Sequence, residues 1–304
     1  MKILKIYKNG GLLLLAAGAT LWSSCKKDGN PNHLPSVSTA AYAGKVDGFT
    51  SSDEIFPKNL VAYWNFDNTT SEKISNTAPT ATVGNSFVTG GVKGQALSLN
   101  AGYLYYGTQF NAFKTAALKS FTVSAWVQIL NNGSKKTMLF QLARPGVFNG
   151  NINFILETNS RAASVTDAIT IHPTFTGQNG GTQDNLNTAN GSFPFQSPKI
   201  GANVWAHIVI TYDASTGIFQ IWGNGKKIGV PAYQSRGTGN TLFNSFEPSE
   251  VIIGGNYNVI PGKSVSSDTS YAPMTGNIDE VRVYNIALPD AYIISLYNLG
   301  LAGK

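Results

Sequence analysis

Two apolar runs joined by a short polar turn decide the fold: Trp205-Ala206-His207-Ile208-Val209-Ile210-Thr211-Tyr212-Asp213 and Ile218-Phe219-Gln220-Ile221-Trp222. In the first run, Ala206, Ile208, Ile210 and Tyr212 alternate with His207, Val209 and Thr211. Apolar positions that recur at every second residue are typical of a β-strand with one face against a core. The turn Asp213-Ala214-Ser215-Thr216-Gly217 predicts that the second strand returns antiparallel to the first.

The same period of two recurs along the rest of the chain, in short runs bounded by Gly, Asn and Asp. Further candidate strands are residues 60–66, 96–99, 103–107, 121–129, 137–142, 152–157, 169–175, 251–254 and 278–284. So many strands with almost no helix between them predict an all-β domain over residues 58–304, a β-sandwich (jelly roll) of two antiparallel sheets. One short C-terminal helix is expected after Pro289, with Ile293, Leu296 and Tyr297 on one face and Gly300 at its end.

Composition and charge exclude several classes of protein. The chain has 304 residues, 42% of them hydrophobic, which is enough for a full-sized core. From Cys25 onward, 19 basic residues (22 minus Lys2, Lys5 and Lys8) stand against 16 acidic ones. This balance is not the dense basic surface that nucleic acid requires, so no nucleic-acid partner is expected. The single cysteine excludes an internal disulfide.

The N-terminus has the pattern of a secretory signal over residues 1–24: three lysines, a short apolar run and small residues before Cys25. This arrangement resembles the lipobox of bacterial lipoproteins, in which that cysteine is acylated, and Cys25-Lys26-Lys27-Asp28 resembles the start of many Bacteroidota lipoproteins. The resemblance implies attachment through the N-terminal lipid to the outer membrane, with surface exposure left open. Residues 25–57 are expected to form a flexible tether. The alternative is a plain secretory signal with a free cysteine.

Several segments taken in order are similar to the laminin-G-like domain of the concanavalin A-like lectin/glucanase superfamily. They are residues 60–67, 91–97, 120–127, 205–213 with 222–226, and 276–288, so the resemblance covers about residues 58–298. The resemblance implies the sandwich fold. It does not fix the function, because this fold hosts lectins, adhesion modules, enzyme appendages and hydrolases.

Catalysis by this domain is not expected. The glucanase relatives carry a Glu-x-Asp-x-x-Glu triplet on one strand, and the sequence has no such triplet. Asp279 and Glu280 are adjacent, so regular alternation would direct them to opposite faces of a strand. We therefore expect a membrane-anchored, non-catalytic lipoprotein that binds polysaccharide or glycan at the cell envelope. The alternatives are a glycoside hydrolase whose carboxylates come from distant loops, and a protein-binding adhesion or scaffold lipoprotein.

Two groups of residues are candidate sites. The alternation places Asp279 in an inward row with Val281 and Val283, and Asp67 and Asn68 follow the first strand. Because members of the resembled family often bind Ca²⁺ near strand ends, Asp67, Asn68 and Asp279 are the expected ligands of a structural Ca²⁺. The alternative is that these groups cap the backbone. For a sugar ligand, which requires aromatic faces and planar polar groups, the candidates are Trp222, Tyr105 and Arg144.

Overall fold

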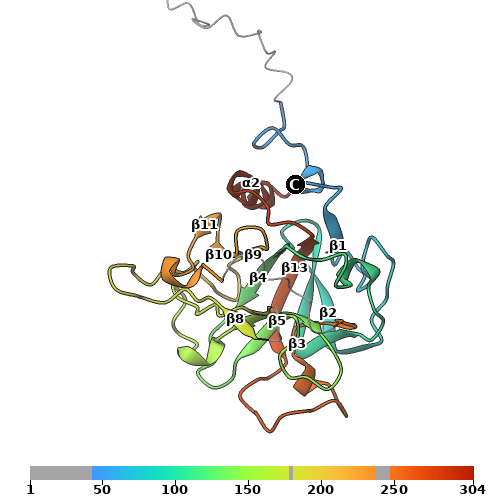
Figure 1. Cartoon of the computed structure of the whole chain (residues 1–304). Helices are drawn as coiled ribbons and strands as arrows, with labels where there is room; N and C mark the ends of the chain where they lie inside the picture. The colour runs from blue at the N-terminus through green and yellow to red at the C-terminus, as the bar shows by residue number, and fades with distance from the viewer. Residues whose placement is uncertain (1–42, 178–180, 237–246) are drawn as a thin grey trace, which may run out of the picture. The chain divides into compact units, whose positions relative to one another are not determined.

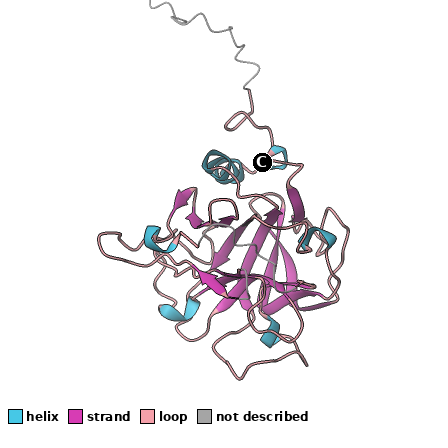
Figure 2. Ribbon diagram, viewed as in Figure 1, coloured by secondary structure: helices cyan, strands magenta, loops and turns pink. Residues whose placement is uncertain are grey.

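Thirteen strands and one α-helix make up the domain (Figures 1 and 2). The structure is a computed structural model that describes residues 43–177, 181–236 and 247–304. The strands are β1 (Leu60–Trp64), β2 (Ala81–Thr89), β3 (Gln95–Tyr106), β4 (Phe121–Ile129), β5 (Thr137–Ala143), β6 (Ile152–Leu156), β7 (Thr174–Thr176), β8 (Thr182–Asp184), β9 (Ala206–Asp213), β10 (Ile218–Gly223), β11 (Lys226–Lys227), β12 (Glu250–Ile253) and β13 (Met274–Tyr284). The helix is α2 (Asp290–Leu301), and short 3₁₀ turns are η2 (Ser52–Glu54), η3 (Asn111–Phe113), η4 (Thr158–Ser160), η6 (Pro231–Tyr233) and η7 (Tyr257–Val259).

The hairpin predicted from the two apolar runs is confirmed as β9 and β10. Tyr212 pairs with Phe219 and Ile210 with Ile221, in an antiparallel register. The Asp213 carboxylate closes the turn by accepting hydrogen bonds from the Ser215 N–H and the Thr216 hydroxyl, at 2.9 and 3.0 Å. The all-β class and the C-terminal helix are confirmed as well.

The strands form one continuous, curled antiparallel sheet rather than two separate sheets. Its order is β11-β10-β9-β4-β13-β3-β12-β5-β6-β7-β8, with β1 paired to β13 and β2 to β3. The join is β3, because its first half pairs with β13 and its second half with β12. The sheet curls back on itself: Phe175 on β7 lies 4.3 Å, centroid to centroid, from Tyr212 on β9, although these strands are distant in the sheet order.

The curl encloses the main apolar core. Side chains from opposite walls meet there, for example Trp64 on β1 and Phe140 on β5, whose rings are 6.2 Å apart. A second cluster lies outside the sheet, where Ile293, Leu296 and Leu299 of α2 cover Trp222 and Tyr284. Within the described residues, no helix is long and apolar enough to cross a membrane.

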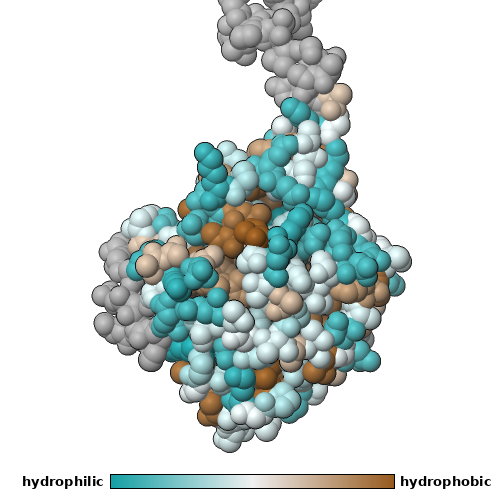
Figure 3. Space-filling model, turned by 90° about the vertical axis from the view of Figure 1, so that its right-hand side faces the viewer, coloured by the Kyte–Doolittle hydropathy of each residue, from teal (hydrophilic) through white to brown (hydrophobic). Residues whose placement is uncertain are grey.

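Several strands differ from the sequence expectation. The candidate strand 169–175 is a strand only at β7 (Thr174–Thr176), and β8 and β11 were not predicted. The segments 96–99 and 103–107 belong to one strand, β3, in which Ala101 has a φ of 48°. β2 lacks an apolar alternation because most of its residues are exposed, and it pairs only with β3. Large exposed hydrophobic residues are few and scattered, and Figure 3 shows separate hydrophobic patches among hydrophilic side chains on one face. Scattered apolar residues of this kind do not single out a binding surface.

The folded unit begins at Gly44, so residues 44–57 are not part of a flexible tether as the sequence suggested. Ile55 is completely buried, and the Ser52 N–H donates to the Lys304 carbonyl at 3.0 Å. The expected signal over residues 1–24, Cys25 and most of the expected tether lie outside the described residues.

A buried charge network fastens this N-terminal segment to β13. The Arg282 Nη2 contacts Glu280 Oε2 at 2.6 Å, Asp53 Oδ1 at 2.8 Å and Ser52 Oγ at 3.0 Å. The Tyr63 hydroxyl donates to Glu280 Oε1 at 2.7 Å, and the guanidinium lies 4.2 Å from the centre of the Tyr63 ring. Burial alone would lower the pKa of Arg282, but the Glu280 carboxylate and its neighbours raise it above the usual range.

Replacing Arg282 with methionine should destabilise the domain by about 3–5 kcal/mol, because the buried Glu280 carboxylate loses its cation. The measurement is the free energy of unfolding in urea. Lys93→Met is the matched control, since it removes the more exposed Lys93–Asp53 pair at 3.4 Å and should cost less than about 1 kcal/mol. Equal losses in the two variants would contradict the importance assigned to the buried pair.

Candidate functional site

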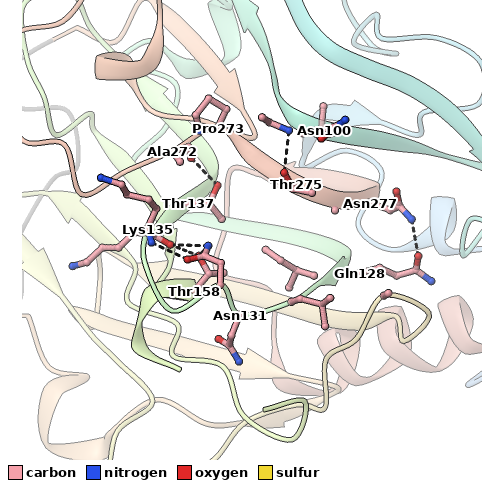
Figure 4. Close-up of a pocket in the computed structure, with 18 of the residues that line it drawn as sticks. Asn100, Gln128, Asn131, Lys135, Thr137, Thr158, Ala272, Pro273, Thr275 and Asn277 are labelled. Carbon is pink, nitrogen blue, oxygen red and sulfur yellow. Dashed lines mark hydrogen bonds between the residues drawn. The ribbon is translucent and has the colours of Figure 1, made fainter. Parts of the chain in front are cut away.

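A cleft of about 630 Å³ lies where the middle of β3, the end of β4 and the starts of β5 and β13 meet (Figure 4). The middle of β3 and the start of β13 supply one part of its lining, and the end of β4 with the turn into β5 supplies the other. The lining residues are 98–101, 128–132, 134–137, 158, 202, 272, 273 and 275–277.

The turn between β4 and β5 is held by the side chain of Asn132. Its Oδ1 accepts the N–H groups of Ser134 and Lys135, both at 2.8 Å. Its Nδ2 donates to the Lys135 carbonyl at 2.9 Å and to Thr158 Oγ1 at 3.0 Å. Thr158 donates in turn to the Lys135 carbonyl at 2.6 Å. One asparagine therefore fixes this wall through backbone and side-chain contacts.

Other polar side chains cross-link the strands that line the cleft. Thr275 Oγ1 on β13 accepts the Ala101 N–H of β3 at 3.0 Å, and Asn277 Nδ2 donates to Gln128 Oε1 of β4 at 2.7 Å. Asn100 is exposed, and its side-chain amide makes no hydrogen bond within the described part of the chain. The cleft therefore combines a cross-linked wall with an amide that is open to a ligand.

The lining combines apolar side chains, such as Leu99, Ile129 and Leu130, with polar ones. It contains no Asp, Glu, His or Cys, and its polar side chains are mainly amides and hydroxyls. Its two lysines are engaged: Lys135 donates to the Thr269 carbonyl, and Lys136 pairs with Glu157 at 3.0 Å. Such groups can exchange hydrogen bonds with the hydroxyls of an uncharged ligand.

A small ionic network is connected to the cleft through Lys136, which lines the cleft and pairs with Glu157. His172 Nδ1 contacts Glu157 Oε1 at 3.0 Å and His172 Nε2 contacts Asp184 Oδ2 at 3.1 Å, so the ring joins β8 to the end of β6. The hydrogen bond to Glu157 raises the pKa of His172, against the effect of burial, and Asp184 adds to this rise. The contacts of Glu157 with His172 and Lys136 lower the pKa of Glu157 to about 2.

The three residues expected to bind a sugar do not line this cleft. Trp222 is buried in the cluster under α2, with Lys227 Nζ 5.1 Å from its ring centre. Tyr105 is buried on the outer side of β3, where its hydroxyl donates to Glu250 Oε1 at 2.7 Å. Arg144 is buried as well, and burial lowers its pKa to about 10. Since each is covered by other parts of the domain, none presents a free face to a ligand.

Asp67 and Asp279 both hold the loop between β2 and β3. Asp67 Oδ1 accepts the Gln95 N–H at 2.9 Å, while Asp279 Oδ2 accepts the N–H groups of Val92 and Lys93 at 2.7 and 3.2 Å. Burial raises the pKa of Asp279 to about 8, against the effect of these hydrogen bonds.

Asp279 does not continue the inward row of Val281 and Val283, because a bulge interrupts β13 between Asp279 and Arg282. Instead, Ile278, Val281 and Val283 enter the core, and Glu280 has a φ of 51°. This shift of phase was not visible in the alternation of the sequence.

These contacts match the alternative expectation that the two aspartates cap the backbone. Asn68 is exposed beside Asp67, and no group of three or more His, Cys, Asp or Glu side chains that could hold a metal occurs among the described residues. Asp279 is occupied by backbone N–H groups, whereas Asp67 is exposed and accepts one backbone N–H and the Asn65 side-chain amide. The Ca²⁺ ion stays a prediction.

The polar turn after β4 is a feature of the sequence that could have indicated this cleft. Residues 130–136 read Leu-Asn-Asn-Gly-Ser-Lys-Lys, a loop rich in amide and hydroxyl groups at the end of a buried strand. The cleft also depends on Asn100 and Asn277, which are far away in sequence and are brought to it only by the pairing of β3 with β13.

The curled antiparallel sheet with one helix near its C-terminal end is the fold of concanavalin A-like domains. The profile of one family, the Concanavalin A-like lectin/glucanases superfamily, matches residues 105–294, and the chain belongs to this family. No curated protein matches the chain.

Solved structures share the fold at low sequence identity. Domain 4 of AbnA, an extracellular arabinanase of family GH43 from Geobacillus stearothermophilus in complex with arabinotriose, has 18% identity and a TM-score of 0.49, over 78% of this chain and 98% of that one. The binding domain of Paraclostridial Mosquitocidal Protein 1 has 17% identity and a TM-score of 0.51, over 79% and 52% of the two chains. A receptor binding domain has 16% identity and a TM-score of 0.50, over 81% and 52%. The chain thus spans about half the length of the last two.

His172 should make the stability of the domain depend on pH. Because its pKa is raised in the folded state, its contribution is fully present below about pH 6.5 and is lost as the pH rises through the raised value. We expect His172→Gln to cost about 1 kcal/mol near pH 5.5 and clearly less at pH 8.5, measured by urea unfolding. His207 does not titrate between pH 5.5 and 8.5, because burial lowers its pKa to about 3, so it does not contribute to this difference. A difference between variant and parent that is the same at both pH values would contradict this assignment.

The contact between Asp67 and the loop can be tested with two glycines. Gly90 and Gly94 both have positive φ, at 82° and 75°, but a Cβ at Gly90 would meet nothing within 4 Å, whereas one at Gly94 would lie 2.1 Å from Asp67 Oδ1. We expect Gly90→Ala to cost about 1 kcal/mol and Gly94→Ala about 2–3 kcal/mol of unfolding free energy. Equal costs would mean that Asp67 moves away freely and does not anchor the loop.

Proposed function

We propose that this chain is a non-catalytic lipoprotein that binds a polysaccharide or glycan at the cell envelope, attached to the outer membrane through an acylated Cys25. The observation that carries the proposal is the cleft of about 630 Å³ between the middle of β3, the end of β4 and the starts of β5 and β13, whose polar side chains are mainly amides and hydroxyls. Sugar hydroxyls are donors and acceptors at once, so they pair well with side chains such as Asn100 and Asn277. Membership in a superfamily of lectins and glucanases supports the same reading.

The lining chemistry supports binding rather than hydrolysis. Glycoside hydrolysis generally uses two carboxyl groups on either side of the scissile bond, roughly 5–9.5 Å apart. The cleft lining contains neither Asp nor Glu. His207 cannot substitute as a base facing the cleft, because it is buried between Ser124, which it contacts at 2.8 Å, and Trp126, whose ring centre lies 4.8 Å away.

The first test of the function is affinity electrophoresis of residues 44–304 through gels that each contain a single polysaccharide, neutral or acidic, with and without EDTA. Retardation by at least one glycan is expected. Loss of retardation with EDTA would support the predicted Ca²⁺, and unchanged retardation would count against it. If no glycan retards the domain, the proposal fails.

The double variant Asn100→Ala/Asn277→Ala should weaken glycan binding about tenfold or more, because each amide contributes hydrogen bonds that water replaces only in part. The dissociation constant is obtained from retardation at several polysaccharide concentrations. Asn111→Ala, at an exposed asparagine of η3, is the control and should bind like the parent. Full affinity in the double variant would place the binding site elsewhere on the domain.

The proposed anchor has its own test. In a bacterial host that processes lipoproteins, the parent chain should be found in the membrane fraction and should incorporate radiolabelled palmitate. Cys25→Ala should lose the label and leave the membrane fraction. Retention of the Cys25→Ala chain together with its label would overturn the assignment of the lipid to this residue.

A further inference from the structure

A second hollow, of about 570 Å³, lies at the tip of the β10–β11 hairpin. Three parts of the chain line it: Asp167 and residues 195–199 of the long connection before β9, Asn224 and Lys226 at the hairpin, and Tyr297 of α2.

This hollow has an excess of positive charge. Lys199 and Lys226 are both exposed, and neither forms an ion pair with any part of the chain that is described. The carboxylate of Asp167 is the one acidic group in the lining. A third cation lies close by, because the Arg161 guanidinium sits 4.5 Å from the centre of the Phe195 ring. Free ammonium groups at the rim of a site select for anionic ligands and accelerate their capture.

The hollow also contains groups suited to a sugar ring. Phe195 and Tyr297 are aromatic and partly exposed. Tyr297 is held in place because its ring stacks on Trp126 at 5.7 Å with an interplanar angle of 17°. Asn224 uses its Oδ1 to accept the His207 N–H at 2.9 Å, which leaves its Nδ2 as a donor toward the hollow.

The hollow and the cleft lie on two sides of one loop. Asn131, which lines the cleft, donates from Nδ2 to the carbonyls of Val165 and Ala168 at 2.8 and 2.9 Å, while Asp167 of the same loop lines the hollow. The next segment connects them as well, because Lys199 lines the hollow and Ala202 the cleft. Three residues of chain keep these two Cα atoms within about 11 Å of each other.

We infer that the ligand is an anionic polysaccharide that extends over this loop, with neutral sugar hydroxyls in the cleft and an acidic group between Lys199 and Lys226. The acidic group is the carboxylate of a uronic acid or a sulfate ester, since both offer oxygen acceptors to an ammonium group. The inference rests on the proposed function, because it names the class of glycan that the same domain would bind.

The test compares the domain with Lys199→Gln/Lys226→Gln by affinity electrophoresis in gels of polygalacturonate, dextran sulfate and unmodified dextran. The domain should be retarded by at least one anionic polymer and less by dextran. The double variant should bind that polymer about three- to tenfold more weakly. Polygalacturonate and dextran sulfate distinguish a carboxylate from a sulfate as the recognised group.

Lys114→Gln/Lys119→Gln is the control for general electrostatic attraction, because it removes the same charge from two exposed lysines near η3. It should bind like the parent, and an equal loss in both double variants would overturn the assignment of the site. Retardation by neutral glycans alone would overturn this inference and leave the proposed function standing. Retardation by none of the polysaccharides, neutral or acidic, would contradict both this inference and the proposed function.

Discussion

A bulge in β13 directs two neighbouring carboxylates to two different parts of the chain, and much of the domain depends on it. Asp279 accepts N–H groups from the loop between β2 and β3, whereas Glu280 pairs with Arg282 and Tyr63. β13 also pairs with β1, β3 and β4, so the strand that carries these acids lies in the middle of the curled sheet. Burying such groups is costly unless they have partners: Glu280 has the Arg282 cation, and Asp279 accepts backbone N–H groups.

Most of the sheet could be predicted from the sequence because its strands bury one face. The β9–β10 hairpin, β4 and β5 all show the alternation or apolar content that burial imposes. β2 could not be found in this way, since its mostly exposed residues carry no period. The bulge in β13 could not be predicted either, because a single extra residue shifts the alternation without requiring a characteristic residue type.

The site was harder to predict than the fold. Aromatic residues on strands are natural candidates for sugar binding, but α2 packs over Trp222, and η7 with its following loop packs over Tyr105. The polar side chains of the cleft are instead small amides and hydroxyls, which occur in many settings and do not by themselves indicate a binding site. Asn100, Asn131 and Asn277 become one surface only after β3 and β4 have paired with β13, and no local pattern in the sequence records that pairing.

The two ends of the folded unit are joined, because the Ser52 N–H donates to the Lys304 carbonyl. Arg282 also donates hydrogen bonds to the side chains of Ser52 and Asp53. This arrangement has a mechanical consequence. A pull that enters the domain at Gly44 is resisted first by the buried contacts of Ser52, Asp53 and Ile55, before it reaches the ladder between β1 and β13. The segment before β1 thus takes up tension where it enters the domain and transfers it through Arg282 to β13 in the middle of the sheet, so that the pairing of β1 with β13 does not bear it first.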